Sequence, residues 1–275
     1  MSVLVNLLQG IQGGAAVVGL AVLLLLEHAH PFFDLFGESR RDWTAHLVRN
    51  LALAVVNGLI VAFVFAGLWV MASGWAVAND FGLMSVVTSS SGEPNWPHAV
   101  GVILLLDAWT YTWHRINHRI PFLWRFHRLH HADAKMDVST AGRFHFGEII
   151  FSSALRIPLI MLVGVFAWEL ILYETMMFAV VQFHHANIVL PARIDQVLRW
   201  IIVTPAMHKV HHSRLRPETD SNYSAFLSIW DRLFRSFRLR AKLSEIEFGL
   251  HEFDAAENRT MKGLLRMPLE AGRRD

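Results

Sequence analysis

Histidines at helical spacing are the clearest chemical signal in the sequence. His114 and His118 lie four residues apart, and two later clusters share the pattern His-x2-His-His. These clusters comprise His127, His130 and His131, and then His208, His211 and His212. Residues three and four apart lie on one face of a helix, so each cluster points several imidazoles in one direction. Imidazole binds iron, copper, zinc and nickel, and we therefore expect these histidines to bind metal.

The number of histidines indicates more than one ion. They exceed what a single ion such as zinc binds, which is about four ligands, so the sequence predicts two metal ions. His184 and His185 form a further pair after a long apolar segment, and we expect both to take part. Adjacent residues on a helix do not face the same way, so the pair is also compatible with one ligand and one residue that supports it.

An acidic residue inside an apolar segment is a candidate partner of these histidines. Asp107 precedes His114 by seven residues, two helical turns away on the same face. A carboxylate within a membrane helix is expected to be functional, and we expect it to accept the N–H of a ligand imidazole. The alternative is a hydrogen bond to Tyr111 or to a neighbouring helix. Weaker candidates for the same role are Glu148, Glu174 and Asp231.

Two further residues are candidates at the same centre. Asn187 follows the histidine pair and is expected to ligate a metal or to orient an imidazole, the alternative being a helix cap. His145 stands apart from the clusters. It is a candidate ligand, or else a structural or substrate-lining residue.

The composition indicates a membrane protein. The chain of 275 residues is 53% hydrophobic and 17% charged, whereas a soluble domain carries nearer a quarter of charged residues. The apolar segments are residues 3–26, 51–72, 99–113 and 149–183. The last is too long for one span at 1.5 Å per residue, and we expect a hairpin near residues 164–169. The fold class predicted is an all-α membrane bundle of about four transmembrane segments.

Basic residues predict the topology. Residues 40–49, 115–143 and 193–216 contain several arginines, whereas residues 73–98 contain neither arginine nor lysine. The positive-inside rule then places the amino terminus and residues 73–98 outside, and the histidine clusters at the cytoplasmic surface. No basic region precedes the first apolar segment, so we expect a retained multi-pass membrane protein and no cleaved signal peptide.

Several kinds of site are excluded or disfavoured. The chain has no cysteine, which excludes disulfides, thiolate nucleophiles and cysteine-bound iron–sulfur clusters. Electrons for any redox reaction must then come from an external donor. The net charge is only +2, and we expect no nucleic-acid partner. Glu-x-x-His occurs only at residues 27–30, without the second copy that soluble carboxylate-bridged di-iron bundles need.

At its histidine motifs the sequence resembles the fatty acid hydroxylase/sterol desaturase superfamily, whose members are integral membrane di-iron enzymes. The resemblance covers residues from about 99 to 240. It includes Trp113-His114-Arg115-x-x-His118, residues 123–131, Gln182-Phe183-His184-His185-Ala186-Asn187 and residues 204–213. Two departures are Phe146, where many members have proline, and Val180, where fatty acid 2-hydroxylases have histidine.

The resemblance implies a domain arrangement and an activity. It implies a transmembrane anchor at residues 1–98, a catalytic domain with a cytosolic histidine-rich helical cap at 99–240, and a cytosolic tail at 241–275. The histidines would hold two iron ions that use O2 to hydroxylate or desaturate a C–H bond of a sterol-like, fatty acyl or other lipid. A separate redox partner (cytochrome b5-like, a ferredoxin or a reductase) would supply electrons. We favour hydroxylation as the commoner simple outcome.

Two other classes of protein use membrane histidines. A metal transporter would carry polar residues within its spans, whereas these clusters lie at the ends of apolar segments. A bis-histidine haem cytochrome needs two ligands for each haem, so the repeated His-x2-His-His clusters would be redundant. Metal analysis and an optical spectrum discriminate between the three classes.

Overall fold

The computed structural model describes residues 2–87 and 96–270, with side chains described from residue 10 onward. The described residues form helices and short 3-10 turns, and include two isolated bridges but no strand. This confirms the expected all-helical fold. The longer helices are α1 (Ser2–Ala29), α2 (Arg40–Ile60), α3 (Ala66–Ala78), α4 (Trp96–Arg119), α5 (Pro121–His131), α6 (Phe146–Val163) and α7 (Ala167–His185).

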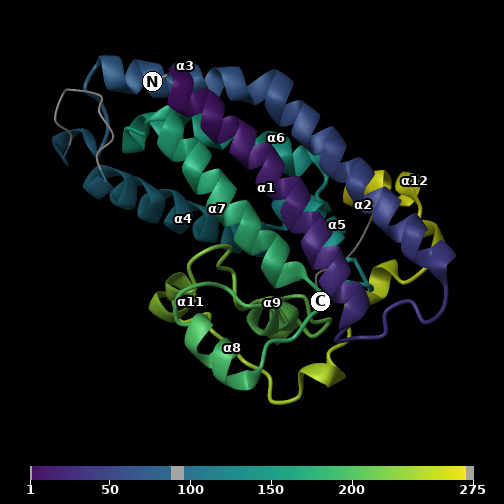
Figure 1. The fold of residues 1–275 in the computed structure, drawn as a ribbon. Coiled ribbons are helices and arrows are strands. Elements are labelled where there is room, and N and C mark those ends of the chain that lie inside the picture. Colours follow the sequence, from purple (N-terminus) through teal and green to yellow (C-terminus); the bar gives the residue numbers. More distant parts are fainter. Residues whose placement is uncertain (1, 88–95, 271–275) are drawn as a thin grey trace.

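Shorter elements make up the rest of the fold. The short helices are α8 (Ala192–Leu198), α9 (Pro205–His211), α10 (Arg216–Thr219), α11 (Ile229–Leu233) and α12 (Met261–Arg266). The π-helical turn η1 (Val61–Phe65) joins α2 to α3. The 3-10 turns are η2 (Ser85–Val87), η3 (Val138–Gly142), η4 (Leu243–Glu245), η5 (His251–Phe253), η6 (Ala256–Arg259) and η7 (Met267–Leu269). In Figure 1 the long helices run side by side, and the short ones gather at one end.

Three helices of the described chain are long and apolar enough to cross a membrane. They are residues Gly10–Ala29, the continuous helix Arg40–Ala78, and Phe146–Val163. The expected span at 99–113 is not among them, because α4 includes polar side chains such as Asp107, Thr110 and His114. The second span is longer than expected, since the π-turn continues the helix without a break. The expected outside loop at 73–98 lies partly in residues 88–95, outside the described residues.

The α6–α7 hairpin forms where the sequence predicts it. Gly164 ends α6 with φ 82°, a left-handed conformation that favours glycine. Glu169 then accepts a hydrogen bond from the Phe166 amide and caps the start of α7. The two helices pack on α3 and α4 through a buried cluster that includes Leu106, Ile160 and Tyr173. The hairpin therefore places the His184–His185 end of α7 beside the end of α4.

Pro121 separates the first two histidine clusters. It is the first residue of α5, after Ile120 in an extended conformation. Proline suits this position because its missing N–H has no partner in the first turn of a helix. His118 therefore lies at the end of α4, and His127, His130 and His131 lie on a separate helix that can turn back toward it.

The carboxyl-terminal tail packs against α5, the helix that carries His127, His130 and His131. Leu264 and Met267 are buried against Leu129 of α5 and Leu53 of α2. The buried Arg128 donates hydrogen bonds to the carbonyl groups of Met267 and Glu270. Residues 271–275 lie outside the described residues. Met261, Leu264 and Met267 lie three residues apart, but this short pattern does not indicate which element the tail packs against.

Candidate metal centre

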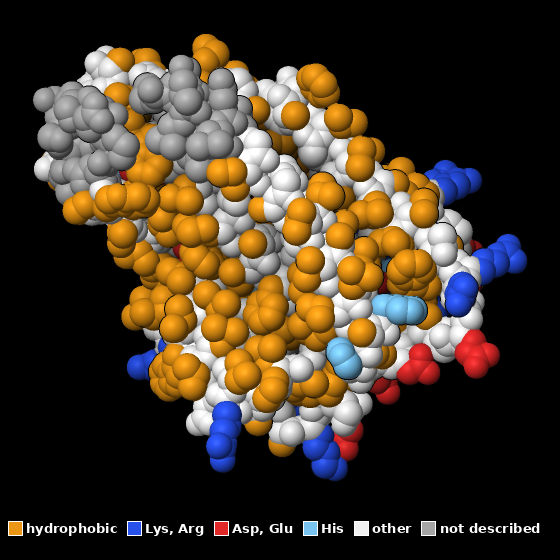
Figure 2. Space-filling model, in the orientation of Figure 1, with side chains coloured by type: hydrophobic (Ala, Val, Ile, Leu, Met, Phe, Trp, Pro, Cys, Tyr) orange, Lys and Arg blue, Asp and Glu red, His pale blue; other side chains and the backbone are white. Residues whose placement is uncertain are grey.

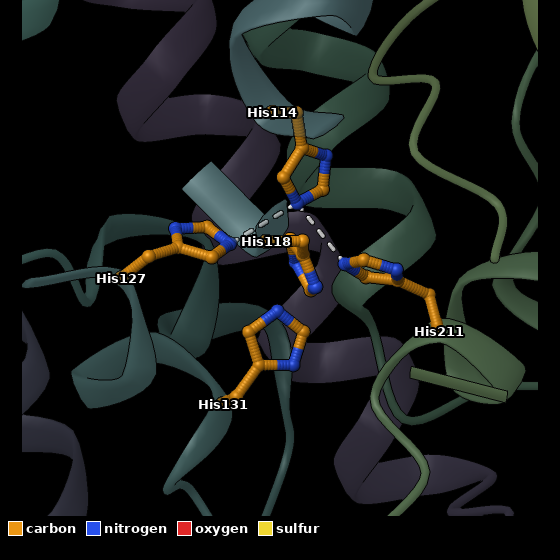
Figure 3. A group of neighbouring side chains, drawn as sticks. All are labelled: His114, His118, His127, His131 and His211. Atoms are coloured by element: carbon orange, nitrogen blue, oxygen red, sulfur yellow. Dashed lines mark hydrogen bonds between the residues drawn. The ribbon is translucent and has the colours of Figure 1, made fainter. Parts of the chain in front are cut away.

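The histidine clusters meet in two adjoining groups. In the first, five ring nitrogens lie within 4.8 Å of one another, from His114, His118, His127, His131 and His211. In the second, four lie within the same distance, from His130, His185, His208 and His212. Figure 3 shows the rings of the first group pointing into a common space. The rings of His131 and His212 stack with centroids 4.5 Å apart, so the groups are immediate neighbours.

Each group draws on several helices. The first combines α4, α5 and α9, and the second combines α5, α7 and the end of α9. Neighbours in sequence join different groups: His130 and His131 separate, as do His211 and His212. This follows from helical geometry, because adjacent side chains point about 100° apart. Histidines that are neighbours in sequence therefore belong to different groups in space.

The hydrogen bonds of the first group leave a site for a cation. His114 Nδ1 donates to the Tyr223 carbonyl (2.7 Å), and His211 Nδ1 donates to the Ser221 carbonyl (2.6 Å). Burial lowers the pKa of His211 to about 3. A neutral ring that donates from Nδ1 has only a lone pair on Nε2, so two such Nε2 atoms cannot hydrogen-bond to each other. The Nε2 atoms of His114 and His211 are nevertheless 3.0 Å apart. A cation between them would bind both lone pairs.

The second group repeats this arrangement. His185 Nδ1 donates to the Val181 carbonyl (2.8 Å), and His130 Nδ1 approaches the Arg143 carbonyl (3.3 Å). Their Nε2 atoms lie 3.2 Å apart, and the Nε2 atom of His208 lies 3.0 Å from that of His185. Two nitrogens about 2.1 Å from one ion at a right angle are about 3 Å apart. Burial lowers the pKa of His130, His208 and His212, which keeps these rings neutral, as metal binding requires.

Glu148 supports the first group. Its Oε1 atom accepts a hydrogen bond from His127 Nδ1 at 2.9 Å, which turns Nε2 toward His114, 3.1 Å away. Asp220 Oδ1 lies 3.5 Å from His118 Nδ1. From the sequence, Glu148 was only a weaker candidate and Asp220 was not a candidate. The signal for Glu148 was a carboxylate near the start of an apolar helix.

His184 lies beside the second group. Its ring centroid is 3.8 Å from that of His208 and 4.7 Å from that of His185, but His184 belongs to neither group of converging nitrogens. It is buried and lines the cavity described below. His185 therefore points into the second group and His184 points beside it, because adjacent side chains on a helix point in different directions.

Asp107 contacts no imidazole among the described residues, which contradicts the role expected for it. Its carboxylate accepts hydrogen bonds from Trp230 Nε1 (2.7 Å), the Leu227 amide (3.0 Å) and the Tyr173 hydroxyl (3.3 Å). Seven residues correspond to about 10 Å along a helix, which is beyond the reach of a carboxylate to His114. The alternative of a bond to neighbouring elements is correct, and Asp107 fastens the loop before α11 to α4 and α7.

Asn187 and His145 also have structural partners. The Asn187 side chain donates to the Phe33 carbonyl (2.9 Å) and accepts from the Phe33 amide (3.0 Å). His145 caps α6 by accepting from the Gly147 amide (3.0 Å), and its Nε2 atom approaches the Leu265 carbonyl (3.3 Å). These bonds occupy both polar atoms of each side chain, so neither residue faces the histidine groups as a ligand would.

A buried polar network, not evident from sequence, lies behind His130. His46 Nε2 contacts Asp133 at 2.9 Å, and Asp133 also accepts from the Thr140 hydroxyl at 2.8 Å. Arg143 donates to Asn50 (2.9 Å) and presents its carbonyl to His130. The network joins α2 to the segment between α5 and α6. It holds the carbonyl that fixes the His130 ring.

A cavity of about 810 Å³ opens from the histidines between the long helices. His114, His127, His130 and His208 line one end of it. The remaining lining is mostly apolar and comes largely from α1, α2, α3, α4, α6 and α7, with small residues such as Gly58. The size is that of a small-molecule site, and its walls suit a hydrocarbon chain.

Comparison with known proteins identifies the family. The fatty acid hydroxylase family matches residues 99–236, a region that contains both histidine groups. The chain belongs to this family. The finding confirms the resemblance to the fatty acid hydroxylase/sterol desaturase superfamily. No solved structure matches the chain.

Relatives within the family are lipid hydroxylases and monooxygenases. The chain is 35% identical to an ornithine lipid hydroxylase of Rhizobium tropici over 165 residues, or 56% of this chain and 47% of the relative. It is 31% identical to human alkylglycerol monooxygenase over 148 residues, or 53% of this chain and 31% of that protein. A cholesterol 25-hydroxylase-like protein of Danio rerio is 26% identical over 190 residues, 67% of this chain and 69% of the relative. The chain thus spans about half of the first relative and a third of the second.

Proposed function

We propose that the protein is a membrane-bound di-iron enzyme that uses O2 to hydroxylate a C–H bond of a lipid. The observation that carries this proposal is the junction of two buried histidine groups with an apolar cavity of about 810 Å³. Family membership and the names of the relatives support it. Desaturation uses the same parts, but the relatives named above are hydroxylases and monooxygenases.

Each histidine group would hold one iron ion. The five-histidine group and the four-histidine group offer neutral nitrogens whose spacing suits one ion each. When bound, the irons would supply the activation of O2. Backbone carbonyls of Tyr223 and Ser221 and the Glu148 carboxylate hold the ring protons on Nδ1, so that Nε2 faces the ion.

The cavity would hold the substrate and exclude water. Its end at His114 and His208 would receive the carbon to be oxidised, and its apolar walls would enclose an alkyl or acyl chain. The relatives' names point to lipids with a polar head, such as an ornithine lipid or an alkylglycerol. The chain has no cysteine and so cannot hold a cysteine-bound iron–sulfur cluster; a separate donor would deliver electrons at the cytoplasmic side.

Iron content and turnover test the proposal together. Protein purified in detergent is expected to contain two iron ions per chain and to show no Soret band. With O2 and an electron donor, membranes containing it are expected to yield a lipid heavier by one oxygen atom. Iron-loaded protein that gives no oxidised lipid, or stoichiometric haem, would contradict the proposal. Metal transport without a product would support the transporter considered above.

A variant of the cavity wall separates substrate binding from iron binding. Gly58→Phe places a ring in the cavity, and no atom lies within 4 Å of the added Cβ position. We expect unchanged iron content and a large loss of lipid turnover. Gly67→Phe is the control, because its Cβ position is equally open but Gly67 does not line the cavity. Equal activity in the two variants would show that the substrate lies elsewhere.

A further inference from the structure

An exposed apolar surface lies outside the membrane-crossing helices, on α8 and α11. We define the α8 patch by the exposed side chains of Val189, Ile194, Val197, Trp200, Ile201, Ile229 and Leu233. Val197 and Trp200 are 68% and 67% exposed. Soluble surfaces rarely gather so many large apolar side chains, and such a patch indicates a contact with a partner or a membrane.

The α8 patch is one continuous and rigid surface. Ser228, which precedes α11, and Arg232, near its end, both donate to the Arg199 carbonyl after α8, at 2.6 and 2.7 Å. The Arg232 guanidinium also lies over the Trp200 ring, 4.5 Å from its centroid. The Val203 amide also donates to the Phe226 carbonyl, and the Ser228 amide donates to the Ile201 carbonyl. The apolar side chains are therefore held on a fixed base and are not a collapsed loop.

The chemistry of the α8 patch matches a membrane surface. It combines aliphatic residues and a tryptophan with nearby arginines, namely Arg193 and Arg235, which are exposed, and Arg232. Amphipathic segments that lie in the headgroup region have this composition, and tryptophan favours that region. Arginines at the same level can bind lipid phosphates.

Position favours the protein's own membrane over a separate partner. Figure 2 shows apolar side chains extending without interruption from the long helices to the region where Figure 1 places α8 and α11. Lys and Arg side chains border this region on the side away from the long helices. If a second copy or a soluble partner covered the α8 patch, we would expect polar residues to separate the patch from the membrane-facing surface of the long helices. The two surfaces are continuous, so lipid that covers the first also reaches the second.

We propose that α8 and α11 lie in the headgroup region of the bilayer and form an interfacial anchor beside the transmembrane helices. The anchor leads directly into the metal-binding part: Trp200 and Ile201 are followed by Thr204 and then α9, which carries His208. Lipid contact at the α8 patch would therefore hold α9 at a fixed depth, with the histidines just beyond the hydrocarbon.

Spin labels on the cysteine-free chain test this proposal. Ile194→Cys and Gln196→Cys place single labels on exposed positions two residues apart, about 200° around α8. O2 concentrates in the hydrocarbon, whereas a nickel chelate stays in water. In nanodiscs of anionic phospholipid, we expect the collision rate of the label at 194 with O2 to be several-fold higher than its collision rate with a water-soluble nickel chelate. The label at 196 should show the reverse preference. Val197→Cys repeats the lipid-side measurement about one turn from residue 194.

Other outcomes overturn the anchor. Strong nickel access at both 194 and 197 would show that the patch faces water. Protection of both positions from both reagents, with short label-to-label distances between chains, would show that a second copy covers it. Iron content and the circular dichroism spectrum, compared with those of the parent protein, establish that each variant is folded before its label is interpreted.

Discussion

Glu148 illustrates what a single carboxylate contributes to the histidine centre. It is buried on α6 and bonds to His127 Nδ1. Glu148→Gln keeps the shape but removes the charge, and such changes behind a metal ligand typically reduce metal affinity about 10- to 100-fold. We expect the variant to lose one iron to a chelator well before the other. The measurement is iron per chain during chelator competition.

The matched control for Glu148→Gln is Glu257→Gln, which makes the same change at an exposed site in the tail. It should release iron as the parent protein does. If both irons leave the Glu148→Gln variant at the parental rate, the carboxylate does not act on the metal. The neighbouring group, which Glu148 does not contact, serves as an internal reference.

Asp107 makes the opposite prediction. Its three hydrogen-bond donors belong to Trp230, Leu227 and Tyr173. Asp107→Ala leaves buried donors unpaired, at about 1–3 kcal/mol for each such group. We expect a lower unfolding temperature in detergent and an unchanged iron content in protein kept below that temperature. Selective loss of one iron without loss of stability would restore the role first expected from the sequence.

At the residue scale, the sequence predicted the kinds of side chain better than their partners. The spacing of His127, His130 and His131 indicated metal binding, because helical spacing is a local property. The pairing of Glu148 with His127 depends on how α6 packs on α5, and no local pattern encodes it. The same reason applies to Asp107 and Asn187, whose partners lie far away in sequence.

Arg128 links two elements, helix α5 and the tail. Its guanidinium is buried, bonds to two tail carbonyls and lies over Phe253, 4.7 Å from the ring centroid. Arg128→Ala removes charged hydrogen bonds that contribute about 1.5–3 kcal/mol each. We expect the tail to detach and trypsin to cleave it faster at residues 259–266. Digestion of the folded protein in detergent, followed by mass spectrometry, measures this.

Arg125→Ala is the control for the tail, because Arg125 lies on the same helix but is exposed. Cleavage at equal rates in the two variants would show that Arg128 does not hold the tail on α5.

Among the elements, the break at Pro121 and the hairpin at Gly164 were predictable from the sequence, since proline and glycine act locally. The packing of the tail on α5 was not, because Leu264 and Met267 lie more than 130 residues from Leu129, their partner on α5.

At the scale of the whole molecule, the distribution of arginines predicts which end faces the cytoplasm. Val86→Cys lies in the loop that lacks basic residues, and Glu257→Cys lies in the tail at the histidine end; both positions are exposed. By the positive-inside rule, a membrane-impermeant maleimide should label residue 86 in intact cells. It should reach residue 257 only after lysis.

The reverse labelling pattern would place the histidine end outside and contradict the predicted orientation.

The sequence predicted the helical class and the membrane setting of the whole molecule, since both follow from its composition and its long apolar segments. It predicted the number of spans less well, because α4 and α7 combine apolar stretches with functional polar residues. Helices that line a site resemble membrane spans only in part.

The division of neighbouring histidines between two groups has a consequence for biosynthesis. His114 and His211, whose Nε2 atoms are 3.0 Å apart, are separated by 97 residues of chain. His208 and His212 complete the other group, so neither group is whole until the ribosome has made α9. By then all three apolar helices of the described chain have been synthesised. On the proposed function, iron would therefore enter only after the three apolar helices have been made, and both ions would enter in the same late stage of maturation.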